Sequence, residues 1–220
     1  MRALVTGGTG RLGGAIAARL EAGGWQVVAA GSRDGDLRSA EAARALVAGA
    51  VSRLEGLDLL VNAAAGGFVP KTFAKVTEAD FDDAFGATVK GSFFATQAAA
   101  RHLAAAGDGV VVMIEDVAGY QPWPSFTAHC AAKAAQGMLT RVLARALAPD
   151  VRVVGIAPGP VAVEPGQQER RARETALGRI GTPGDIADAV VYLAGASFVT
   201  GTTLVVDGGR LLQSGAHPVT

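Results

Sequence analysis

Two kinds of hydrophobic segment alternate along the chain. Short runs rich in β-branched residues are typical of buried strands, and longer alanine-rich stretches with scattered charges are typical of helices. The pattern predicts strands at 2–6, 25–30, 58–62, 110–114, 151–156 and 203–206. It predicts helices at 11–22, 39–54, from Thr77 onward, 89–106, 127–148 and 182–194. Such alternation is typical of parallel strands joined by crossover helices.

The strands are apolar on both faces, which indicates a sheet covered by helices on both sides. We therefore predict an α/β fold with a Rossmann-like, doubly wound parallel sheet in three α/β/α layers. A single domain is expected over residues 1–220. The polar segment 159–178 lies between two regular elements and is predicted to be a substrate loop.

Composition narrows the possible functions. The 220 residues carry 20 Lys+Arg and 20 Asp+Glu, so a basic surface for nucleic acid is not expected. The sequence has no long apolar run free of charged residues, so no membrane-spanning helix is expected. One cysteine excludes a disulfide framework within the chain. The first residues form a predicted strand and show no secretion signal, so we predict a cytoplasmic protein. We also predict no metal site.

A glycine-rich turn follows the first predicted strand. Gly8, Gly10 and Gly13 match the G-x-G-x-x-G spacing between a strand and a helix. Turns without side chains let backbone N–H groups approach a pyrophosphate, and the helix N-terminus favours an anion. An ordinary glycine-rich turn is the alternative. The context favours a dinucleotide site.

The residue type after the second strand bears on the choice of nucleotide. A site for NAD usually has an acid about 20 residues past the last glycine, on the ribose hydroxyls. By that count the chain reaches Arg33, and Arg11 is a second cation nearby. A guanidinium suits a 2′-phosphate, which favours NADP. Asp34 and Asp36 follow at once and keep NAD possible.

Three ionisable residues form a candidate catalytic set. Asp116 follows the strand 110–114, where parallel sheets hold ligands. His129 and Lys133 are four residues apart, so they share one face of the predicted helix. An imidazole between a carboxylate and an ammonium can act as a general acid near neutral pH. The alternative is a packing histidine beside a solvated lysine.

The chain resembles the short-chain dehydrogenase/reductase family over residues 1–212. The resemblance rests on Thr6-Gly7…Gly13, Leu60–Gly66, the His129…Lys133 pair, Pro158–Val161 and Val206–Gly209. It implies hydride transfer with a nicotinamide cofactor. With the two arginines above, it implies cofactor contacts at Gly7, Thr9, Gly10, Arg11, Leu12, Gly13, Arg33, Asp36, Leu37, Asn62, Ala63, Ala64, Lys133, Pro158, Gly159 and Val161.

The sequence departs from the family at the catalytic positions. The family uses a serine, a tyrosine that exchanges the proton, a lysine four residues later and a relay asparagine. Here Asp116, His129 and Thr88 stand at the serine, tyrosine and asparagine positions, and only Lys133 remains. The family also has a helix and a strand before its Asp-Leu pair. Here Asp36-Leu37 follow Arg33 almost directly, which predicts a deletion and a more open adenine site.

Within the family, the motifs resemble pteridine reductases most. Aspartate in place of serine and arginine at the position of Arg11 are shared with that group, which implies NADPH and a pterin. Phe68 would stack on the flat substrate, with Asp116 at its edge.

Three functions remain open: a reductase of a pterin-like or other conjugated substrate, a carbonyl or alcohol dehydrogenase, and an NADP(H)-binding protein without chemistry. The resemblance also implies a homo-oligomer, a dimer or tetramer, through the helices at 89–106 and 131–148. Small-molecule binding is expected in all three.

Overall fold

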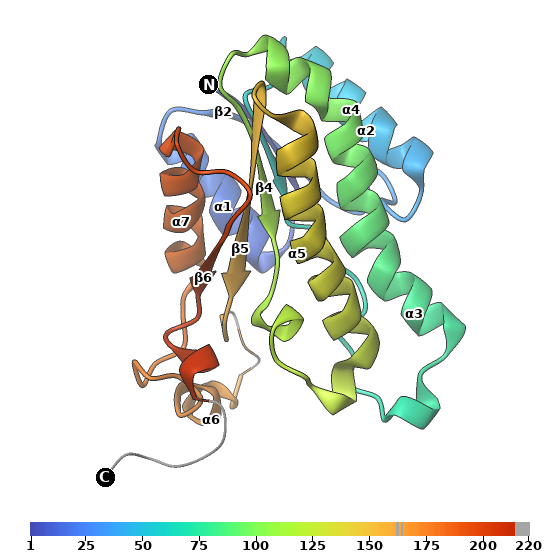
Figure 1. Ribbon diagram of the computed structural model, residues 1–220, viewed down its shortest axis with the longest axis vertical. Coiled ribbons are helices and arrows are strands. Elements are labelled where there is room, and N and C mark those ends of the chain that lie inside the picture. Colours follow the sequence, from blue (N-terminus) through green and yellow to red (C-terminus); the bar gives the residue numbers. More distant parts are fainter. Residues whose placement is uncertain (162, 164, 214–220) are drawn as a thin grey trace.

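The computed structural model describes residues 1–161, 163 and 165–213 and contains strands and helices in alternation (Figure 1). The strands are β1 (Arg2–Thr6), β2 (Gln26–Ala30), β3 (Leu59–Asn62), β4 (Gly109–Ile114), β5 (Val151–Pro158) and β6 (Thr203–Val206). The longer helices are α1 (Arg11–Ala22), α2 (Ala40–Leu54), α3 (Glu78–Phe85), α4 (Ser92–Ala105), α5 (Thr127–Leu147) and α7 (Pro183–Gly195). The predicted α/β fold is confirmed.

One parallel sheet has the strand order β2-β1-β3-β4-β5-β6. The order reverses direction at β1, and the helices after β1 and β3, α1 and α4, cover opposite faces of the sheet. Such sheets hold ligands at this point. Strand β2 is the outer strand on its side, and the chain then enters α2 directly. This agrees with the deletion of a helix and a strand predicted after β2.

Helices cover both faces of the sheet. On one face, α1 and α7 enclose a core that includes Val5, Ile16, Val112, Ile186 and Val190. On the other, α2, α4 and α5 pack over a second core with Leu4, Leu60, Val111, Leu103 and Val153. Strands β3, β4 and β5 are buried along their whole length, which explains why they lack an alternating pattern.

Polar residues define where the helices begin. Thr77 and Asp80 form a capping box at the start of α3, and Thr182 and Asp185 form another at α7, where Pro183 is the first helical residue. Two features differ from the prediction. The helix expected at 89–106 begins with a π-helical turn, η2 (Gly86–Gly91), and the predicted loop 159–178 contains the short helix α6 (Gln168–Ala172).

Candidate functional site

The glycine-rich turn lies between the end of β1 and the start of α1. Gly7 has a φ of 65°, a left-handed conformation that favours glycine. A Cβ at Gly13 would lie 2.2 Å from the Gly7 carbonyl oxygen, so only glycine permits this approach of helix to turn. The turn is also tied to β2, because Gly8 N donates to the Ala30 carbonyl at 2.8 Å. The geometry therefore makes a narrow backbone cradle at a helix N-terminus, which is the kind that binds a phosphate.

A cavity of about 700 Å³ opens beside this turn. Its walls are Gly7, Thr9, Gly10, Ala30, Gly31, Ser32, Gly35, Asp36, Leu37, Arg38, Leu46, Ala63, Ala64, Ala65, Gly66, Asp83 and Ala87. Most of these side chains are small, so the space suits a flat ligand next to the phosphate cradle. The threonine that ends β1 orients the opposite wall, since Thr6 Oγ1 accepts hydrogen bonds from Ala63 N and Ala64 N at 3.2 and 3.3 Å.

The cation beside this cavity differs from the predicted one. Arg33 is exposed and is not among the residues that line the cavity, whereas Arg38 is. The turn after β2 explains this, because Asp34 Oδ2 accepts from Gly31 N at 2.8 Å and directs the chain back toward the cavity. Arg38 then pairs with Asp36 and with Asp83 of α3. Arg38 directly follows the Asp36-Leu37 pair, which was the available sequence signal.

Some of the other predicted cofactor residues line the cavity, and some do not. Gly7, Thr9, Gly10, Asp36, Leu37, Ala63 and Ala64 line the cavity. Asn62 is buried, and its amide donates to Thr96 Oγ1 at 3.1 Å and lies 3.4 Å from Met113 Sδ, so it braces β3. Arg11 and Leu12 occupy the first turn of α1, and Pro158 ends β5.

Asp116 and His129 come together at the carboxyl end of β4. Their Oδ2 and Nε2 atoms are 3.3 Å apart. Asp116 is held in place because its Oδ1 accepts from Ala118 N at 2.8 Å, which caps η3 (Val117–Gly119). His129 lies in the first turn of α5 and is 4% exposed. Its Nδ1 is buried and has no hydrogen-bond partner among the described residues. The pair is thus a carboxylate that orients an imidazole.

Lys133 lies one turn further along α5 and is also buried. Its Nζ donates to the Ile114 carbonyl at 2.8 Å and to Gln136 Oε1 at 3.0 Å. Burial lowers the pKa of Lys133 to about 8, against the opposing effect of Asp116 and Glu115. Gln136 in turn donates to Ser92 Oγ of α4 at 3.3 Å. This fully buried glutamine was not predicted, because one of its two side-chain partners, Ser92, lies 44 residues away in sequence.

Glu115, the residue before Asp116, is a buried acid that also contacts α5. Its carboxylate accepts hydrogen bonds from Thr140 at 2.6 Å, Thr203 at 3.1 Å and Tyr120 at 3.3 Å. Glycine at position 155 makes room, since a Cβ there would lie 2.1 Å from Glu115 Oε1. Burial raises the pKa of this carboxyl, and its hydroxyl partners and the Lys133 charge oppose that rise. Glu115 and Lys133 are thus close enough for each to favour the charged form of the other.

Aromatic rings form a wall beside His129. The ring of Phe68 lies 4.9 Å from the His129 ring, edge to face, and stacks on Phe126 at 4.6 Å. Trp123 meets Phe126 edge to face at 6.1 Å. Phe126 ends η4 (Pro124–Phe126), directly before α5. The predicted neighbours Phe68, Asp116 and His129 therefore do lie together, and Phe126 and Trp123 extend the group. We call Phe68, Phe126 and Trp123 the aromatic wall.

The relay position of the family holds Thr88, within the π-helical turn η2. Its Oγ1 is buried without a hydrogen-bond partner in the described part of the chain. Among those same residues, no helix is long and apolar enough to cross a membrane, and no group of three or more metal-binding side chains occurs.

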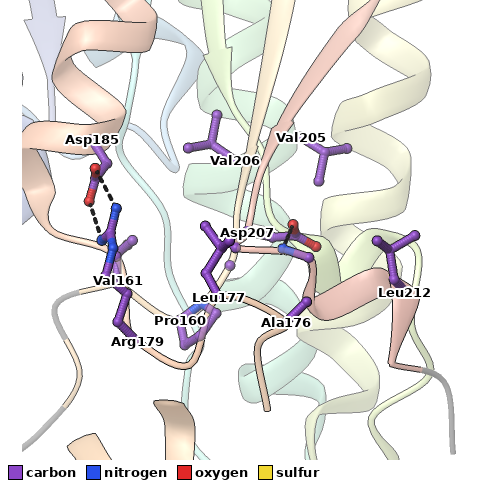
Figure 2. A pocket seen from close by; sticks show the side chains of 14 residues that line it. Pro160, Val161, Ala176, Leu177, Arg179, Asp185, Val205, Val206, Asp207 and Leu212 are labelled. Carbon is purple, nitrogen blue, oxygen red and sulfur yellow. Dashed lines mark hydrogen bonds and ion pairs between the residues drawn. The ribbon is translucent and has the colours of Figure 1, made fainter. Parts of the chain in front are cut away.

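A second cavity, of about 410 Å³, lies where the end of β6 meets the segment after α6 (Figure 2). Gly159, Pro160 and Val161 line it from the segment directly after β5, and Ala176 and Leu177 line it from the segment after α6. The ion pair between Arg179 and Asp185 borders it at 3.1 Å, as Figure 2 shows. Two of the predicted cofactor residues, Gly159 and Val161, therefore face this space.

Comparison with known proteins identifies the chain. A family model described as enoyl-(acyl carrier protein) reductase matches residues 15–210. A 4-formylbenzenesulfonate dehydrogenase from Comamonas testosteroni is 34% identical, over 94% of this chain and 96% of the relative. The 3beta-hydroxysteroid dehydrogenase 1 of Eggerthella lenta is also 34% identical, over 96% of this chain and 94% of the relative.

A solved structure agrees with these sequence matches. The 3-ketoacyl-(acyl-carrier-protein) reductase of Brucella melitensis, complexed with NADH, superimposes with a TM-score of 0.89 at 28% identity, over 95% of this chain and 97% of that one. The relatives differ in substrate, and none named here acts on a pterin. The chain therefore belongs to the short-chain dehydrogenase/reductase family of NAD(P)-dependent oxidoreductases.

Proposed function

We propose that the protein is an NADP-dependent reductase of a flat, conjugated substrate of the pterin type, with His129 as the proton donor. The observation that carries the proposal is the contact of His129 with Asp116 on one side and with Phe68 on the other. A proton source and a surface for a flat ring thus meet at one point, at the carboxyl end of β4.

The cofactor site supports a dinucleotide on structural grounds. The turn at Gly7 and Gly13 has no space for side chains, and the 700 Å³ cavity continues from it. When bound, the nicotinamide supplies the hydride. Lys133 has two of its three N–H groups engaged by protein acceptors, and the third is available to a ribose hydroxyl. We favour NADP because Arg38 borders the cavity, with Arg11 and Arg33 nearby, whereas Asp36 beside it keeps NAD as the alternative.

The proton would follow a short route. His129 donates from its ring to the substrate, and Asp116 stabilises the charged imidazole and fixes its orientation. The Asp116 side chain is 25% exposed, so the pair can recover its proton from solvent. The Thr88 hydroxyl, which has no hydrogen-bond partner among the described residues, is then not needed to return a proton to His129.

NADPH oxidation in the presence of a dihydropterin tests this function. Phe68→Ala removes the ring beside His129 and is expected to lower kcat/KM at least tenfold, because stacked aromatic contact is lost. Phe73→Ala is the matched control: this ring lies on η1 (Phe73–Lys75), is 79% exposed and should have no effect. NADH in place of NADPH should give a higher KM.

Two other functions predict different results. A carbonyl or alcohol dehydrogenase, the second candidate, is favoured by the relatives, which include a 4-formylbenzenesulfonate dehydrogenase and a 3beta-hydroxysteroid dehydrogenase. It would tolerate Phe68→Ala. A protein that binds NADPH tightly but turns over neither a dihydropterin nor an aldehyde would be a nucleotide-binding module, and the reductase proposal would then be wrong.

Glu115 gives this function a predicted pH dependence. The Lys133 ammonium is needed to hold the ribose, and its pKa of about 8 places the loss of charge just above neutral pH. The negative charge of Glu115 raises that pKa. Glu115→Gln keeps the size and an acceptor oxygen for Thr140 but removes the charge. The alkaline fall in kcat/KM should therefore begin at a lower pH than in the wild type.

A kcat/KM profile from pH 6 to 10 measures this shift. Asp188→Asn, which removes an exposed carboxylate on α7, is the control and should leave the profile in place. An unchanged alkaline limb in Glu115→Gln would mean that the charge of Glu115 does not affect the pKa of Lys133, and it would contradict the prediction.

We further propose that the described residues of the 159–178 segment border the substrate, in a single-domain protein. Association into dimers or tetramers through α4 and α5 is supported by exposed apolar residues, because Met138 and Val142 on α5 are 54% and 53% exposed. Sedimentation velocity distinguishes these states from a monomer. A cytoplasmic location stays a prediction.

A further inference from the structure

Arg210 lies where three segments meet at the border of the candidate site. It opens η5 (Arg210–Leu212), after β6. Its guanidinium lies 4.8 Å over the ring of Trp123, its Nε donates to Gln121 Oε1 at 3.4 Å, and its Nη1 is 2.7 Å from Glu174 Oε2. The side chain is only 13% exposed. A largely buried cation of this kind requires negative charge nearby.

The negative charge around Arg210 is shared with other cations. Glu174 accepts hydrogen bonds from Arg171 Nη1 at both carboxylate oxygens, at 3.2 and 3.0 Å. Arg170 approaches the same carboxylate at 3.7 Å, so three guanidiniums surround one acid. The negative charge of Asp207 also favours the charged form of Arg210, but the carboxylate oxygens of Asp207 accept hydrogen bonds from Gly209 N and Leu211 N. Within the described residues, no carboxylate pairs with Arg210 through two parallel hydrogen bonds.

The aromatic wall connects this cation to the catalytic pair. Starting at His129, the rings of Phe68, Phe126 and Trp123 follow one another at 4.9, 4.6 and 6.1 Å, and Arg210 covers the last of them. Burial lowers the pKa of Arg210, and the nearby charges of Glu174 and Asp116 oppose that shift. His129 therefore contacts one end of the aromatic wall, and the Arg210 guanidinium covers the other end.

We propose that Arg210 binds an oxyanion of the substrate, which makes the substrate class an acidic, conjugated carbonyl or imine compound. The ring lies along the aromatic wall, with the reacting carbon near His129 and a carboxylate or sulfonate on Arg210. Guanidinium groups bind such oxyanions through paired, charge-assisted hydrogen bonds. This inference rests on the proposed function for the reacting end, and Glu174 is the internal anion that the substrate replaces.

Equilibrium binding of two aromatic aldehydes tests the proposal without turnover. The probes are 4-formylbenzoate and its neutral methyl ester, titrated into the NADP-loaded protein. Trp25 and Trp123 are the two tryptophans, so the Trp25→Phe background reports on Trp123 fluorescence, and calorimetry checks the values. The anion should bind at least tenfold more tightly than the ester, and Arg210→Gln should remove that preference while leaving ester and NADP binding unchanged.

Glu174→Gln distinguishes ligand binding from a merely structural link between segments. Both Arg210→Gln and Glu174→Gln break the same ion pair. If Arg210 only holds α6 against the aromatic wall, both variants should weaken both probes equally. If Arg210 binds the oxyanion, Glu174→Gln removes a competing carboxylate and should tighten 4-formylbenzoate. Arg170→Gln, at a position 62% exposed in the same cluster, should change neither probe.

The two proposals fail separately. Anion preference that depends on Arg210, without turnover of any aldehyde or dihydropterin, would overturn the proposed reductase and keep the oxyanion site. Turnover of a dihydropterin with equal binding of the acid and its ester would overturn the oxyanion site and keep the reductase.

Discussion

Replacing His129 with alanine is expected to lower kcat about 100-fold or more, since positioned general acids contribute a factor of this size. The imidazole is the titratable group in contact with both Asp116 and Phe68, so proton supply to the substrate should fail with it. His129 does not line the 700 Å³ cavity, and the Kd for NADPH should stay within about twofold. Stopped-flow hydride transfer and an NADPH fluorescence titration measure the two effects.

Substitutions at and near His129 show whether the loss of kcat comes from the missing proton donor. Asp116→Asn should lower kcat as well, because the amide does not stabilise a charged imidazole. Cys130→Ala, one residue along α5, is the matched control and should leave the rate unchanged, since its Sγ only approaches the carbonyls of Gln121 and Trp123. Wild-type rates in His129→Ala would contradict its role as the acid. His129→Tyr introduces the phenol that the family uses and asks whether the position accepts it.

Gly13→Ala is expected to weaken NADPH binding at least tenfold and to destabilise the fold by about 1–3 kcal/mol, as overpacking of a tight contact does. The added methyl group would lie 2.2 Å from the Gly7 carbonyl oxygen and 3.0 Å from Gly8 Cα. Backbone atoms on both sides prevent relief by a rotamer change, so the turn must separate from α1. Urea unfolding and an NADPH titration test both parts of this prediction.

The same substitution at a glycine with open space around it should stabilise the fold instead of destabilising it. Gly49 lies within α2, and a Cβ there would meet no heavy atom within 4 Å. Gly49→Ala should therefore stabilise the protein by up to about 1 kcal/mol through helix propensity. NADPH binding should be unchanged. If Gly13→Ala behaved like Gly49→Ala, the close approach of turn and helix would not matter for the cofactor.

Local signals explain how much of the fold was predictable. The β-branched runs of β4 and β5 coincide with strands that are buried on both faces, and Thr182 with Pro183 marks the start of α7 correctly. The helix α6 was missed since four of its five residues are polar and it has no apolar face to detect. The π-helical turn η2 was missed because its residues also fit an ordinary helix.

The candidate site was predictable where its residues lie close in sequence or at the end of one strand. His129 and Lys133 share a helix face, and Asp116 ends β4, so their meeting followed from local rules. Gln136 and Arg210 were missed because each has a partner that is distant in sequence: Ser92 is 44 residues from Gln136, and Gln121 is 89 residues from Arg210. Counting residues from the glycine turn selected Arg33, but a turn closed by Asp34 brings Arg38 to the cavity instead.

Helix α5 carries His129, Lys133, Gln136 and Thr140 at steps of four, three and four residues, so all four lie on one face. At 1.5 Å per residue, this series extends about 16 Å from the substrate side to the buried Glu115. An inserted or deleted residue within the series would turn everything beyond it by about 100° and separate the proton donor from its supports. This half of the helix can therefore vary in residue type on its outer face, at Met138 for example, but its length is set by the chemistry at both ends.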